Sequence, residues 1–334
     1  MTKLTILILS TVAAFAAATF SSGTPAAAAQ ALAGKTVFIL SLTPSCDTCA
    51  TFANVATDAL KQEGANVIVE YVDFGQAAQQ TQQFNRAIST NPAAILLWPT
   101  DQTSLLPALA RAKQTNPSVP IVIGVYPPAT ADTTLYSAFF GMDEEEMGAR
   151  QAASLVAGLK SIGKAPEGSV LHITGALGGF TTTARQKGFA AGLAKAAPGL
   201  KVVETQTANW DLSQAQTVAT TMFSKYANAN IVGVFAHSDT MLQGAILAGE
   251  RAGKQAGKDF VAVGIDCDPI GYQNVKAGKE YSTVLWNPVL MGKFGAELTI
   301  KVAQGISVPK MTTLDTPEIT KESAEKCIGA TVKG

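Results

Sequence analysis

Apolar, β-branched runs alternate with amphipathic stretches of helical length along most of the chain. Runs typical of strands lie at 36–42, 66–72, 93–98, 119–125, 168–173, 200–206, 230–235, 259–265 and 281–286. Amphipathic stretches lie at 52–64, 75–90, 103–114, 143–160, 182–196, 211–227, 239–253 and 289–304. Fully apolar strands that alternate with helices predict parallel sheets covered on both faces.

These strands would make one very large sheet, so the pattern favours two doubly wound, Rossmann-like α/β domains. The first break is expected near FGMDEEEMG (140–148), where an acidic trio opens a long helix and suits its N-terminal dipole. No Pro-rich or low-complexity linker follows the first thirty residues, so we expect a hinge made of chain crossings, with further crossings near 286 and 315. The predicted lobes are 33–142 plus 287–315, and 143–286 plus 316–334.

The first 29 residues have the pattern of a secretory signal peptide. One early lysine, Lys3, precedes a short apolar stretch, a polar segment and a run of small residues, with cleavage expected after Ala29 or Ala31. The alternative is a retained membrane helix, but the apolar core is short and no charge cluster follows it. No cysteine lies at the cleavage site, which argues against a lipid anchor. The mature protein is therefore expected to be soluble and exported.

Composition narrows the possible functions. Basic and acidic residues are balanced at 25 each, without a basic patch or an acidic tail, so nothing indicates binding to nucleic acid. About 305 residues remain after the leader, enough for roughly two domains. Export implies an oxidising compartment, in which the four cysteines can pair.

Signatures of catalysis are weak. GALGGF (175–180) lacks the spacing of a dinucleotide- or phosphate-binding loop and is interpreted as a turn before a helix. The only two histidines are His172, expected in the core, and His237. The acidic run Glu144, Glu145 and Glu146 is interpreted as a solvated helix face rather than an acid/base pair.

Several motifs, in order and spacing, resemble the type I periplasmic binding proteins of sugar ABC transporters, close to the ribose-binding protein. These motifs are ILLWPTD (95–101), VPIVI (119–123), TARQKGF (183–189), VFAHSDTMLQGA (234–245), VGIDCDP (263–269) and DTPEITKESAEK (315–326). The resemblance covers nearly the whole mature chain, and it implies two lobes joined by a three-crossing hinge.

The resemblance also implies ligand contacts. Arg185 matches an arginine that donates paired hydrogen bonds to ligand, with a surface ion pair as the alternative. Asp266 matches an aspartate that accepts from ligand hydroxyls, and its alternative role is capping the helix that starts near Asp268. Trp210 matches an aromatic that stacks on a sugar ring, with a core position as the alternative. Ser238 replaces an asparagine, whereas Asp239 is expected to cap the following helix.

The first-lobe wall departs from the family pattern. Val125 and Tyr126 stand where the family has an Asp-Arg pair, and Trp98 and Trp286 stand where it has amides. Asn287 follows Trp286 and is expected to add a polar contact. An asparagine and two phenylalanines of the first loop correspond to Cys46, Thr48 and Cys49. These changes predict a ligand that is less hydroxylated than ribose, or a sugar held mainly by stacking.

The loop TPSCDTCATF (43–52) joins a strand to a helix and carries a C-x-x-C pair, for which three interpretations remain open. A thiol redox centre would use the helix dipole to activate Cys46. A metal site would combine Cys46 and Cys49 with Cys267 and His237. The interpretation we favour is a structural Cys46–Cys49 disulfide, which leaves Cys267 and Cys327 as a second pair.

The expected function is therefore that of a periplasmic, non-enzymatic solute-binding protein. By resemblance, it would close its lobes on a sugar or polyol and deliver it to an ABC permease in the inner membrane. No cofactor is expected, and the protein is expected to be a monomer. The alternatives are a periplasmic thiol-redox or metal-binding protein using Cys46 and Cys49, or the ligand sensor of a chemoreceptor.

Overall fold

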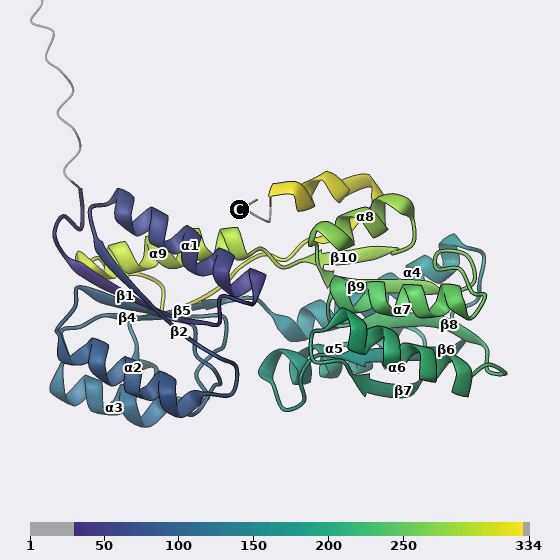
Figure 1. Ribbon diagram of the computed structural model, residues 1–334, viewed down its shortest axis with the longest axis horizontal. Coiled ribbons are helices and arrows are strands. Elements are labelled where there is room, and N and C mark those ends of the chain that lie inside the picture. The colour runs from purple at the N-terminus through teal and green to yellow at the C-terminus, as the bar shows by residue number, and fades with distance from the viewer. Residues whose placement is uncertain (1–29, 330–334) are drawn as a thin grey trace, which may run out of the picture.

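The computed structural model describes residues 30–329, which form two α/β lobes side by side (Figure 1). The predicted leader at 1–29 and the last five residues lie outside the described residues. The first lobe contains a six-stranded sheet in the order β11-β5-β4-β3-β1-β2, and all its pairs are parallel. Its strands are β1 (Thr36–Leu42), β2 (Asn66–Val72), β3 (Ala94–Leu97), β4 (Ile121–Gly124), β5 (Ala138–Gly141) and β11 (Met311–Thr313).

The second lobe contains a six-stranded sheet in the order β12-β10-β9-β8-β6-β7. Five of its strands are parallel, and β12 pairs antiparallel with β10. The strands are β6 (Gly168–Thr174), β7 (Leu200–Thr207), β8 (Ile231–Ala236), β9 (Val261–Asp266), β10 (Ser282–Leu285) and β12 (Glu318–Thr320). The predicted fold class, two doubly wound α/β lobes, is confirmed, and each of the nine predicted strands is present.

Helices cover both faces of each sheet. In the first lobe α1 and α9 lie together on one face, and α2 and α3 cover the other (Figure 1). In the second lobe α4 and α5 pack together on one face, and α6 and α7 pack on the other. The helices are α1 (Asp47–Gln62), α2 (Ala77–Ser89), α3 (Leu106–Thr115), α4 (Glu144–Ser161), α5 (Phe180–Ala196), α6 (Leu212–Lys225), α7 (Asp239–Arg251), α8 (Pro269–Ala277) and α9 (Pro288–Ala303).

The chain passes between the two sheets three times: between β5 and α4, between β10 and α9, and between β11 and β12. One buried apolar cluster continues through these crossings, and Trp98 and Trp286 belong to it. We retain residues 33–142 plus 287–315, and 143–286 plus 316–334, as the proposed lobes. Because each lobe is built from discontinuous segments, the crossings can act as a hinge.

A short 3-10 helix, Lys321–Gly329, lies beside α8 in the second lobe. Cys327 in this helix forms a disulfide with Cys267, which directly follows β9. Glu325 adds an ion pair to Lys276 of α8, with the Nζ and Oε1 atoms 2.6 Å apart. The C-terminal segment is therefore anchored to the loop that follows β9.

Candidate ligand-binding site

The carboxyl ends of the strands in both lobes face each other, and the backbone there is unusual. Of six non-glycine residues with positive φ in the described part of the chain, five lie at or just after the ends of strands β4, β7 and β9. They are Val125 (φ 71°), Asn209 (49°), Trp210 (67°), Asp266 (130°) and Cys267 (60°). Such backbone is disfavoured for L residues and gathers at binding and catalytic sites. This edge is therefore the first candidate for a ligand site.

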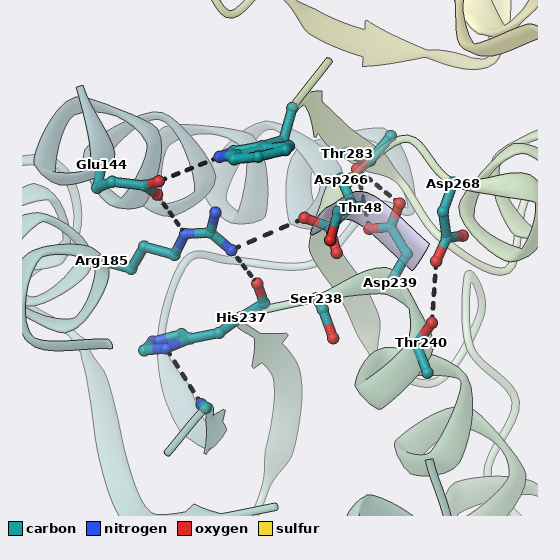
Figure 2. Close-up of polar contacts among 12 residues, drawn as sticks. Thr48, Glu144, Arg185, His237, Ser238, Asp239, Thr240, Asp266, Asp268 and Thr283 are labelled. Carbon is teal, nitrogen blue, oxygen red and sulfur yellow. Dashed lines mark hydrogen bonds and ion pairs between the residues drawn. The ribbon is translucent and has the colours of Figure 1, made fainter. Parts of the chain in front are cut away.

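Arg185 is held rigidly at this edge, in the second turn of α5. Its side chain is 3% exposed, and its Nε donates to Glu144 Oε2 at 2.7 Å. Its Nη1 donates to the carbonyl oxygen of His237 and lies 3.9 Å from Asp266 Oδ1 (Figure 2). The guanidinium thus reaches from the start of α4 to the end of β9.

Glycines allow α4 and α5 to approach closely enough for this contact. A Cβ at Gly148 would collide with the Arg185 backbone, and one at Gly188 would collide with the Glu145 carbonyl. These collisions involve main-chain atoms, which no rotamer change relieves. The two glycines therefore bring the first residue of α4 beside Arg185.

The expectation that the whole acidic run is a solvated face is wrong for Glu144. Its side chain is 2% exposed, and its second oxygen accepts from Trp286 Nε1 at 3.1 Å. Glu145, by contrast, pairs with Lys187 at the surface. The signal in the sequence was weak but present: Met147 and Gly148, three and four residues on, share the face of Glu144 and are buried.

Asp266 ends β9 beside other carboxyl groups, Asp239 and Asp268 (Figure 2). Removal from water raises the pKa of Asp266 well above its usual value. Arg185 opposes this shift, whereas Asp239 and Asp268 reinforce it. Asp268 caps α8 by accepting from the Gly271 amide at 2.7 Å. Because Asp268 fills the capping position, the Asp266 carboxyl is left to face the site.

The expectation that Asp239 caps α7 is also wrong. Ser238 is the cap, and its Oγ accepts from the Met241 amide at 3.2 Å. Asp239 instead turns inward, where it accepts from the Cys267 amide at 2.7 Å and from Thr283 Oγ1 at 2.8 Å. Ser238 was predicted to contact the ligand. Its Oγ already accepts one hydrogen bond in this cap, so its hydroxyl proton remains able to donate another.

Aromatic side chains from both lobes gather at the same edge. Trp98 lies 5.9 Å from Trp286 and 6.3 Å from Tyr126, measured between ring centroids. Tyr126 in turn contacts Phe180 of the second lobe at 5.9 Å. Trp210 lies under the guanidinium of Arg185, with Cζ 5.9 Å from the ring centroid. Phe180 was not singled out from the sequence, because it stands in a glycine-rich turn without apolar periodicity.

Buried polar atoms without a partner also occur here. In residues 30–329 they include Ser41 Oγ, Trp98 Nε1, Thr100 Oγ1, Thr174 Oγ1 and Thr182 Oγ1, each at or near the end of a strand or the start of a helix at this edge. Buried polar groups are normally hydrogen-bonded, so these five atoms are candidates for hydrogen bonds to a polar ligand or to water.

The C-x-x-C loop lies at the first-lobe side of this edge, where α1 begins. Cys46 and Cys49 form a disulfide, and Cys46 is the N-cap of α1. Thr48 Oγ1 lies 3.2 Å from Cys46 Sγ, and Cys49 is buried. Asn287 is the N-cap of α9, its Oδ1 accepting from the Leu290 amide at 2.9 Å. Its amide nitrogen takes no part in this cap.

His237 and His172 form a buried pair behind the site rather than a metal centre. Their Nε2 atoms are 2.9 Å apart, and burial lowers the pKa of His172 to about 3. His172 is a core residue, as predicted. No group of three or more His, Cys, Asp or Glu side chains within residues 30–329 is arranged to hold a metal ion.

Two α/β lobes joined by three chain crossings, with polar and aromatic side chains gathered where their strand ends meet, form the architecture of a two-lobed binding protein. Residues 38–307 match the periplasmic binding protein domain, and the chain belongs to this family. The resemblance indicated by the sequence motifs is therefore confirmed.

Two of the similar proteins are named for the sugars that they bind. The chain is 31% identical over 163 residues to the galactofuranose-binding protein YtfQ of Escherichia coli K12, covering 47% of this chain and 51% of that protein. It is 34% identical over 163 residues to the D-allose-binding periplasmic protein of the same organism, covering 49% and 50%. The chain thus spans about half the length of these two relatives.

A solved structure extends the similarity over both lobes. A periplasmic solute-binding protein of an ABC transporter from Actinobacillus succinogenes 130z, with bound D-allose, superposes with a TM-score of 0.75 at 26% identity. The superposition covers 87% of this chain and 99% of that protein. The similarity therefore includes the edge at which the strand ends of the two lobes meet.

Proposed function

We propose that this protein binds a sugar or polyol between its lobes and delivers it to an ABC permease. The arrangement that best supports this is Arg185 held between Glu144 and Asp266 beside the indole of Trp210. A guanidinium and a carboxyl group can donate to and accept from ligand hydroxyls, while an indole covers the C–H face of a sugar ring. The D-allose bound in the similar solved structure, and the galactofuranose for which YtfQ is named, are consistent with this chemistry.

In this proposal each lobe contributes a different kind of contact. The second lobe orients the ligand through Arg185, Asp266 and Ser238, with Trp210 as the stacking platform. The first lobe and the hinge enclose it with Tyr126, Trp286 and Asn287, and with the loop of Cys46, Thr48 and Cys49. Hinge closure then buries the ligand between the lobes. The work is reversible binding rather than chemistry.

We further propose that the protein acts in the periplasm after removal of its leader. None of the described helices is long and apolar enough to cross a membrane. Cleavage after Ala29 would keep Gln30 and Ala31, which donate to the Gln62 carbonyl and the Glu63 carboxylate. We expect a monomer, since the ligand contacts named here come from one chain.

A thermal-shift screen of pentoses, hexoses and polyols tests the proposed function. A ligand at 100 times its dissociation constant should stabilise the folded chain by about 2.7 kcal/mol. Loss of uptake of that ligand in a deletion strain would assign the protein to an importer, whereas retained uptake with lost chemotaxis would assign it to a sensor. If no sugar or polyol shifts the transition, the proposed ligand class is wrong.

A further inference from the structure

The charges at the site are dominated by carboxyl groups. Arg185 is the only cationic side chain among the ten labelled residues of Figure 2, which include Glu144, Asp239, Asp266 and Asp268. His237 adds no positive charge, because burial lowers its pKa well below its usual value. Glu144 cancels the charge of Arg185, and each aspartate is either neutral or negative. The net charge of these side chains is therefore never positive, whether Asp266 is protonated or ionised.

Glu144 is also fixed in place. One oxygen accepts from Arg185 Nε at 2.7 Å and the other from Trp286 Nε1 at 3.1 Å. With both oxygens bonded and the side chain 2% exposed, Glu144 cannot turn to solvent and leave Arg185 free for another anion. Its neighbour Glu145 differs: it is 47% exposed, and its partner Lys187 is 70% exposed.

We propose that Glu144 sets the charge selectivity of this site, so that it accepts uncharged sugars and polyols and rejects their carboxylate forms. The inference rests on the proposed sugar-binding function and names the ligand class within it. A uronate or aldonate entering the site would lose its hydration without finding an unpaired cation. Discrimination thus comes from an unfavourable interaction built against the wrong ligand.

Substitution of Glu144 should relax this selectivity. E144Q removes the negative charge but keeps an oxygen that can accept from Trp286 Nε1. The Arg185 guanidinium is then available for paired hydrogen bonds to a ligand carboxylate. E144D keeps the charge and should keep the preference for neutral ligands. E145Q, one residue along the same helix, is the matched surface control.

The experiment is isothermal titration calorimetry with three matched pairs: D-galactose and D-galacturonate, D-glucose and D-glucuronate, and D-ribose and D-ribonate. For at least one pair, the wild type and E145Q should bind the neutral member at least about a hundredfold tighter than the carboxylate. In E144Q this ratio should fall by about tenfold or more, while E144D retains the wild-type preference. A tenfold change corresponds to about 1.4 kcal/mol.

The outcomes separate the two proposals. A wild-type ratio below about tenfold, or equal losses of selectivity in E144Q and E144D, would overturn the role of the Glu144 charge while leaving sugar binding intact. If the wild type binds none of the neutral sugars here and none in the thermal-shift screen, the proposed function fails and this inference falls with it. Circular dichroism establishes that each variant is folded. If E144Q does not fold, the wild-type ratio together with E144D decides the question.

Discussion

Two ion pairs join α4 to α5 at neighbouring positions, and they provide a controlled test of the site. Glu144–Arg185 is buried with a separation of 2.7 Å, and Glu145–Lys187 is exposed with a separation of 2.9 Å. The distances and the helices are alike, so burial is the main difference. Double-mutant cycles with glutamine at each position measure the coupling free energy of each pair.

The coupling free energies of the two ion pairs are expected to differ severalfold. Removing one partner of a buried pair typically costs about 3–5 kcal/mol, because the remaining charge is left without compensation. Replacing Arg185 also removes the donor from the hydrogen bond that its Nη1 makes to the His237 carbonyl oxygen. We expect a coupling energy of about 2–3 kcal/mol for the buried pair. For the exposed pair we expect about 0–1 kcal/mol, since solvent screens it.

Urea denaturation followed by circular dichroism gives the four unfolding free energies of each cycle. The titrations are repeated in 1 M NaCl, where the Debye length falls to about 3 Å. The coupling of the exposed pair should shrink in salt, and that of the buried pair should persist. Equal coupling energies for the two pairs, or loss of the buried coupling in salt, would refute the assignment of Glu144 and Arg185 as one buried unit.

Three further predictions follow from the same site and its supports. W210A should weaken sugar binding about tenfold or more in calorimetry, because the stacking surface is lost; unchanged affinity would remove Trp210 from the site. Burial raises the pKa of Asp239 to about 7, so the stability that its retained proton contributes is present below about pH 4 and lost as pH rises toward 7. D239N should therefore gain stability relative to wild type across that range, and thermal melts that show a pH-independent difference would contradict this. Replacing Cys267 and Cys327 by serine should lower the free energy of unfolding in urea by about 4 kcal/mol. Replacing Cys46 and Cys49, which close a much shorter loop, should lower it by about 2 kcal/mol. Equal losses would count against the loop-closure explanation.

The sequence predicted the fold well where the pattern is long. Nine apolar runs correspond to strands because parallel strands covered on both faces need continuous apolar residues. The three missed strands are short: β5 has four residues, and β11 and β12 have three each. Runs of three or four residues are too short to show a period of apolar and polar positions. They form strands here because a neighbouring strand offers main-chain donors and acceptors for hydrogen bonds.

The sequence predicted individual residues of the candidate site, but not the contacts that depend on tertiary packing. Arg185 and Asp266 were selected from motifs, and the structure places them 3.9 Å apart. The burial of Glu144 depends on the close approach of α4 and α5 through Gly148 and Gly188, which is a tertiary effect. The exchange of roles between Ser238 and Asp239 depends on where α7 begins, and boundaries are the least certain part of any pattern.

The central claim is that a sugar binds between the lobes with Arg185 among its contacts. Titration calorimetry of the best hit from the thermal-shift screen, on wild type and R185A, tests this most directly. We expect one ligand per chain in the wild type and an affinity at least about a hundredfold weaker in a folded R185A, since a charged hydrogen-bond donor is lost. A folded R185A that binds the same sugar with wild-type affinity would contradict the account.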